Sequence, residues 1–135
     1  MARIINVEGI GPTYKQILKE KVGITTTEAL LEAAASPGGR DRLAAKTGIS
    51  PKLILEWANL ADLFRIKGVG EEYSDLLEEA GVDTVVELAQ RNPDNLFTAL
   101  QETNEREALV RRLPTLRQVR DWVAQATQMP RVLTY

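Results

Sequence analysis

GIGPTY at residues 9–14 recurs as GVGEEY at residues 68–73, so the 135-residue chain carries one short pattern twice. Two glycines around one aliphatic residue are typical of a tight turn in which a glycine adopts a positive φ. Helical patterns follow both copies, and the N–H groups in the first turn of a helix have no intrahelical acceptor. Each copy therefore predicts a hairpin that presents backbone amide donors at a helix start.

Further landmarks repeat in the same order, which indicates a duplication. They are Gly23-Ile24 and Gly81-Val82, Thr26 and Thr84, Leu30 and Leu88, Ser36-Pro37 and Asn92-Pro93, and Trp57 and Trp122. Two accidental glycine turns would not explain the paired caps and tryptophans. We interpret the chain as two repeats, residues 1–64 and residues 65–135. The second repeat ends in a C-terminal tail that is either docked or mobile.

Each repeat is expected to form four short helices, which predicts an all-α fold packed as one compact unit. Pro12 suits the first turn of a helix and Gly23 suits its end. Thr26 is a good N-cap, and Thr84 with Glu87 has the spacing of a capping box. Both tryptophans lie on apolar helix faces and are predicted core anchors, at positions 57 and 122. No segment has the pattern of a strand.

These patterns resemble helix-hairpin-helix motifs. The residues that carry the resemblance are Gly9-Ile10-Gly11-Pro12 with Gly23-Ile24-Thr25-Thr26, and Gly68-Val69-Gly70 with Gly81-Val82-Asp83-Thr84. Over essentially its whole length, the chain is similar to a bacterial domain-of-unknown-function family with a tandem pair of such motifs, each with two added helices. The resemblance implies an all-α fold and a capacity to hold nucleic-acid backbone without reading sequence. It implies no settled activity.

The composition excludes most catalytic sites. The chain has no Cys and no His, which removes thiolate nucleophiles, zinc sites built on sulfur or imidazole, and the commonest acid/base side chain. The Gly-x-Gly pairs are not dinucleotide fingerprints, because no third glycine follows at the required spacing. We expect no catalytic residues, no metal, no cofactor and no small-molecule substrate.

Hydropathy and charge restrict the location and the partners. No stretch approaches the roughly 20 apolar residues of a membrane span, and the N-terminus lacks an apolar signal segment. We expect a cytoplasmic protein without membrane contact. The net charge of −2 gives weak attraction to phosphate, and 5% aromatic residues are too few for a base-stacking platform.

Charges are distributed unevenly between the repeats. Residues 1–64 hold 8 basic and 7 acidic side chains (+1), and residues 65–135 hold 9 and 12 (−3), which together give −2. The second repeat has an acidic run from residue 71 to residue 87, followed by a basic patch of Arg106, Arg111, Arg112, Arg117 and Arg120. One interpretation is that these are solvated helix faces. The other is that the arginines dock an acidic partner or phosphates, which suits the forked donors of Arg.

The predicted partner-binding residues of the hairpins are Gly9, Gly11, Thr13, Lys15, Gly68 and Gly70. DNA-binding members of the helix-hairpin-helix superfamily often place Lys or Arg two residues beyond the second glycine, where this chain has Thr13 and Glu72. Glu71 and Glu72 would fill the start of their helix and repel phosphate. Any phosphate contact is therefore expected at the first hairpin, with Arg3, Lys15 or Lys19 nearby.

Residues 44–54 also follow the spacing of a helix-turn-helix, which would make residues 51–64 a recognition helix. That helix offers few polar side chains to base edges, and the second repeat lacks the corresponding glycine. We favour an ordinary corner between two helices.

The sequence thus predicts a non-catalytic adaptor or scaffold that binds another macromolecule. The preferred partner is a protein, bound through the hairpins and the basic patch. The alternative is weak, sequence-independent binding of nucleic-acid (DNA) backbone through the first hairpin.

Overall fold

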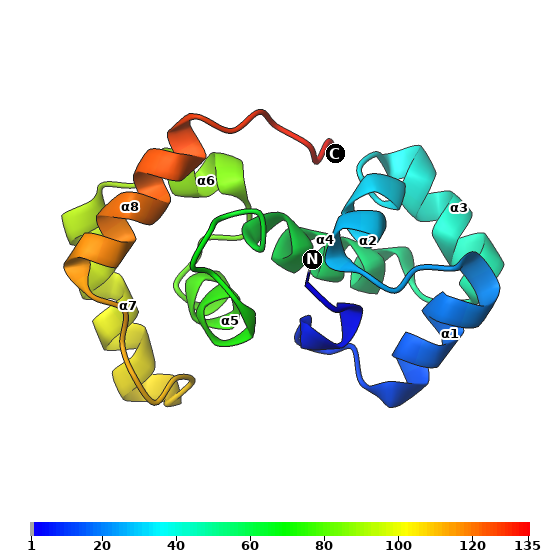
Figure 1. Cartoon of the computed structure of the whole chain (residues 1–135), viewed down its shortest axis with the longest axis horizontal. Coiled ribbons are helices and arrows are strands. Elements are labelled where there is room, and N and C mark those ends of the chain that lie inside the picture. Colours follow the sequence, from blue (N-terminus) through cyan, green and yellow to red (C-terminus); the bar gives the residue numbers. More distant parts are fainter. Residues whose placement is uncertain (1) are drawn as a thin grey trace. The chain divides into compact units, whose positions relative to one another are not determined.

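The computed structural model describes residues 2–135, and in that range it is all-helical, with no strand (Figure 1). The predicted all-α fold is confirmed, with four α-helices on each side of the two-repeat division. The elements are the 3-10 helix η1 (Ile4–Asn6) and the α-helices α1 (Pro12–Val22), α2 (Thr27–Ala33), α3 (Pro37–Thr47), α4 (Pro51–Leu63), α5 (Glu71–Glu79), α6 (Val85–Ala89), α7 (Pro93–Glu107) and α8 (Leu116–Thr127).

The helices form two compact units. The first contains the described residues up to Asp62 together with Arg131–Tyr135, and the second is Leu63–Pro130. The chain therefore leaves the first unit at the end of α4 and returns to it after α8. This differs from the expected division at residues 64/65, which had assigned the tail to the second repeat.

The tail is docked on the first unit. The amide of Thr134 donates to the carbonyl of Ala35 at 2.8 Å, and Leu133 is 2% exposed. Arg40 is buried beside the tail, and its guanidinium donates to the carbonyls of Ala34 at 2.9 Å and Thr134 at 2.8 Å. These bonds join the corner between α2 and α3 to the last residues of the chain.

Local capping explains where the helices begin. The hydroxyls of Thr26 and Ser36 accept the amides of Ala29 and Gly39, at 3.1 and 3.0 Å, and Pro37 follows its cap as the first helical residue. Such bonds satisfy amides that the helix itself leaves without an acceptor. The equivalent cap in the second unit is Asn92 before Pro93.

The predicted capping box of Thr84 and Glu87 forms only in part. Thr84 accepts the amide of Glu87 at 3.3 Å, but the carboxylate of Glu87 accepts from the amide of Asp83 instead, at 2.8 Å. The reciprocal bond therefore falls one residue before the cap. A complete capping box starts α8, where the Thr115 hydroxyl accepts the Gln118 amide at 3.1 Å and the Gln118 side chain accepts the Thr115 amide at 2.8 Å.

Each unit has its own apolar core. In the first, α1 and α2 pack on α3; in the second, α5 packs on α7, and α8 packs on both α6 and α7 (Figure 1). Trp57 and Trp122 are each 1% exposed, so the prediction that they are core anchors is confirmed. A buried indole of this size contributes much of the apolar surface that a small unit removes from water.

Candidate functional site

The first hairpin, residues 9–14, lies at the surface with only its central aliphatic side chain inside. Gly9, Gly11 and Thr13 are exposed, whereas Ile10 is 3% exposed. Gly9 has φ of 92°, a conformation that side chains disfavour. The buried Ile10 fixes the loop on the unit, so the flanking backbone is presented to solvent in a defined geometry.

The start of α1 offers unfilled amide donors. Gly11 is its N-cap and has no side chain to cap it, no acidic residue lies in the first turn, and the first helical bond runs from the Lys15 amide to the Gly11 carbonyl at 3.0 Å. The amides of Thr13 and Tyr14 are left facing solvent at the positive end of the helix dipole. Lys15, Lys19 and Arg3, the cations expected to lie near this hairpin, are exposed.

An aromatic pair joins the first hairpin to α4. The Tyr14 ring contacts the indole of Trp57 edge-on, with ring centroids 4.9 Å apart. The indole Nε1 of Trp57 is buried and has no hydrogen-bond partner among residues 2–135. Packing, and not a polar bond, therefore holds the hairpin to α4.

The second hairpin, residues 68–73, has the same geometry but a different helix start. Gly68 has φ of 98°, Val69 is 5% exposed, and Gly70 is an N-cap without a side-chain bond. The first turn of α5 carries the exposed carboxylates of Glu71 and Glu72. These groups place negative charge where the helix dipole favours it, so the second helix start presents acceptors in front of its amides.

The five arginines of the basic patch are all exposed, on the end of α7, the following loop and α8: Arg106, Arg111, Arg112, Arg117 and Arg120. Arg120 forms an ion pair with Asp94 at 3.1 Å, at the start of α7. Arg106 lies in the last turn of the same helix, twelve residues or about 18 Å further along. Arg106 and Arg120 are therefore associated with opposite ends of α7, and the five arginines do not converge on one point.

The loop of the basic patch lies beside the second hairpin. The hydroxyl of Tyr73 donates to the carbonyl of Arg112 at 3.0 Å, and the Tyr73 ring contacts Trp122 with centroids 5.3 Å apart. The second unit thus joins an acidic helix start to a basic loop. The first hairpin belongs to the other unit, so the predicted site residues form two separate groups, one per unit.

One carboxyl group just before α6 has a shifted pKa. Partial burial, with a smaller contribution from the neighbouring charge of Glu87, raises the pKa of Asp83 above its usual value. The backbone explains the proximity, since the Asp83 amide donates to the Glu87 carboxylate.

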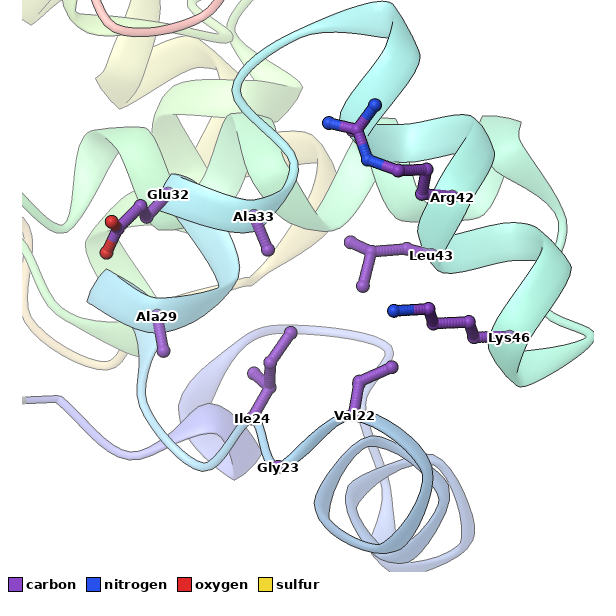
Figure 2. A pocket seen from close by; sticks show the side chains of 10 residues that line it. Val22, Gly23, Ile24, Ala29, Glu32, Ala33, Arg42, Leu43 and Lys46 are labelled. Atoms are coloured by element: carbon purple, nitrogen blue, oxygen red, sulfur yellow. The ribbon is translucent and has the colours of Figure 1, made fainter.

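Sequence reasoning missed an open cleft in the first unit. It has a volume of about 470 Å³ and lies between the end of α1, α2 and α3 (Figure 2). The residues that line it are Val22, Gly23, Ile24, Ala29, Glu32, Ala33, Gly39, Arg42, Leu43 and Lys46. The available signal was the Gly38-Gly39 pair at the start of α3, followed by Arg42 and Lys46, which are one helical turn apart.

Other classes of site receive no support from the geometry of residues 2–135. In that range, no three acidic side chains lie close enough to hold a metal ion. None of the helices described is both long and apolar enough to span a bilayer.

Fold and site together define an all-α protein of two small helical units, each with an exposed glycine hairpin supported by a Tyr–Trp pair. The chain belongs to the family described as Domain of unknown function (DUF4332), whose model matches residues 8–129. Comparison with curated proteins and with solved structures gave no match.

Proposed function

We propose that the protein is a non-catalytic adaptor that binds protein surfaces through its two hairpins, which we interpret as helix-hairpin-helix motifs. The observation that carries the proposal is that one hairpin geometry is used twice with opposite charge. Helix α1 holds three lysines and one glutamate (+2), whereas α5 holds five acidic residues and no basic one (−5).

The first hairpin suits an acidic protein surface. Its free amides at Thr13 and Tyr14 and the nearby Lys15 are donors, and no acid in the first turn competes for them. Carboxylates of a partner would complete the helix start, a contact favoured by the dipole and by charge-assisted hydrogen bonds.

The second hairpin suits a partner of the opposite kind. Glu71 and Glu72 are exposed acceptors at its rim, with the loop of the basic patch next to them through Tyr73 and Arg112. A surface with both acidic and basic groups is more complementary to a protein surface of mixed charge than to a uniform polyanion. Complementary charges across an interface favour the correct partner and speed its association. Two hairpins with different chemistry are what an adaptor between two partners requires.

Site-specific photo-crosslinking tests this proposal. A photoreactive residue is placed at Thr13 or at Glu72, with Thr98 on the exposed side of α7 as the matched control position, and nuclease-treated cell extract is irradiated. We expect defined protein adducts at both hairpins, with different partners at each. If the yield of protein adducts at the hairpins is no higher than at the control position, the adaptor proposal is overturned.

Backbone binding of DNA is the second candidate, favoured by the open helix start of α1 and its lysines. Titration of duplex DNA at low and moderate salt tests it, because a protein that neutralises phosphates loses affinity steeply as salt rises. Lys15→Gln is expected to lower the slope of log affinity against log salt by about 1, and Lys52→Gln on α4 to leave it unchanged. No binding at low salt would eliminate this candidate.

A further inference from the structure

We propose that the cleft of the first unit, bounded by α1, α2 and α3, is a binding site for a small aliphatic carboxylate. The site is separate from both hairpins and does not depend on the adaptor function. Its volume of about 470 Å³ lies within the range of small-molecule sites, which is about 300–1,000 Å³.

The floor and walls of the cleft are aliphatic. Ile24 and Leu43 are buried at its base, and Ala29 and Ala33 face it from α2 (Figure 2). Small side chains on α2 leave the space open, because their methyl groups do not reach across to α3. An alkyl chain placed there would exchange water for apolar contacts, at roughly 25 cal/mol per Å² buried.

Two cations stand on one wall. Arg42 and Lys46 are four residues apart on α3, so they share a face of the helix, and Lys46 points into the cleft (Figure 2). Neither forms an ion pair with any residue in the described range 2–135. Glu32 stands on the opposite wall, and its carboxylate is directed away from both cations (Figure 2). The cleft therefore offers a positive rim above an apolar floor.

The glycines of α3 shape this arrangement. A β-carbon at Gly39 would lie 2.3 Å from the carbonyl oxygen of Ala33, so only glycine allows α3 to begin this close to α2. A β-carbon at Gly38 would lie 3.3 Å from Nη1 of Arg42, which shows that the guanidinium folds back over that residue. Gly38 thus makes room for the cation at the edge of the cleft.

The second unit provides an internal comparison. Thr47 and Thr103 mark the same place in α3 and α7, since each hydroxyl donates to the carbonyl four residues earlier, at 2.6 and 2.7 Å. At this register, Arg42 and Lys46 correspond to Thr98 and Glu102. The Gly38-Gly39 pair corresponds to Asp94-Asn95. The paired cations and glycines therefore belong to the cleft and not to the shared scaffold.

The chemistry of the lining selects the ligand class. A carboxylate would accept charge-assisted hydrogen bonds from Arg42 and Lys46, and an aliphatic chain would pack on the apolar floor without needing further polar partners. An uncharged alcohol of the same length would lose the cationic contacts. These contacts, not the floor, should therefore distinguish the two ligands.

Titration of the full chain with decanoate, followed by ¹H–¹⁵N chemical-shift mapping, tests the site. We expect saturable shifts centred on the amides of Gly23, Gly39 and Lys46. The exposed double variant Arg42→Gln/Lys46→Gln should weaken decanoate binding about tenfold, and decanol should bind the unaltered chain about tenfold more weakly than decanoate. A charge-matched control, Lys19→Gln/Lys52→Gln, should bind as the unaltered chain does.

A second variant tests the space of the cleft independently of its positive charge. Ala29→Leu keeps both cations and a good helix former in α2 while it fills the cleft, so decanoate binding should be lost with the melting temperature retained. The proposal is overturned if decanoate gives no saturable shifts at these amides. Equal affinities for decanoate and decanol, or decanoate binding unaffected by either cleft variant, would overturn it as well.

Discussion

Gly9 lies against the indole of Trp57 so closely that a β-carbon at residue 9 would be 3.1 Å from the indole Nε1. Gly68 and Trp122 stand in the same relation, also at 3.1 Å. In both units, therefore, the first glycine of the hairpin is fitted to the tryptophan of the fourth helix. The hairpin cannot shift without disturbing the core, which makes its exposed amides a rigid surface.

Gly9→Ala should destabilise the first unit more than Gly11→Ala, which changes only the N-cap of α1. Residue 9 combines a φ of 92° with the close indole, and alanine there is expected to cost about 1–3 kcal/mol of unfolding free energy. Gly11 has an extended backbone, and nothing lies within 4 Å of a β-carbon built there. Urea denaturation of the two variants measures the difference. Equal midpoints would contradict the proposed fit.

Arg40→Met should loosen the C-terminal tail. The substitution leaves the carbonyls of Ala34 and Thr134 without their donors, at a cost of about 1–3 kcal/mol of unfolding free energy. Hydrogen exchange of the Thr134 amide, which donates to Ala35, should become faster. The exposed Arg42→Met serves as control and should change stability by less than about 0.5 kcal/mol. Unchanged exchange at Thr134 would show that Arg40 does not hold the tail.

Thr115→Ala should destabilise the second unit by about 1 kcal/mol, because it removes the hydroxyl of the complete capping box before α8. Thr98→Ala is the matched control, because Thr98 is an exposed residue in the interior of α7. It should be neutral or slightly stabilising, since alanine is the better helix former. Thermal melts of both variants make the comparison. A loss of stability at Thr98 as large as at Thr115 would argue against the cap.

Asp83→Asn should raise the melting temperature near neutral pH by a small amount. The folded chain raises the pKa of Asp83, so the ionised carboxylate opposes folding above that pKa. As pH falls through the raised pKa toward the model value of 3.8, Asp83 becomes protonated in the folded and then in the unfolded chain, and its cost disappears. The difference between variant and unaltered chain should therefore shrink on acidification. A difference that grows at low pH would reverse the assigned sign.

Much of the local structure was predictable because its causes are local. Pro37 after Ser36 and the left-handed Gly23 fix helix ends through two or three neighbouring residues. The predicted positive φ of a glycine in each turn is found at Gly9 and Gly68. The carboxylate of Glu87 accepts from the amide of Asp83, one residue before the amide that a capping box would predict.

The cleft was missed, and the choice between a docked and a mobile tail was left open, because both features depend on segments distant along the chain. Arg40 has the sequence appearance of an exposed charge, yet it is 6% exposed, since its donors meet the carbonyl of Thr134, 94 residues away. The cleft beside Lys46 depends on Gly39, which allows α3 to begin close to α2. No period or cap signals such an approach.

The amino-acid sequence by itself determined the all-helical fold, several of the helix caps and the two exposed hairpins, because hydrogen bonds and steric limits within a few residues select those conformations. Tertiary packing alone decided that the last five residues join the first unit, that the five arginines do not converge on one point, and that Arg42 and Lys46 lie beside an apolar cleft. Long-range contacts have this freedom because burial rewards apolar area from any part of the chain, whatever its position in the sequence.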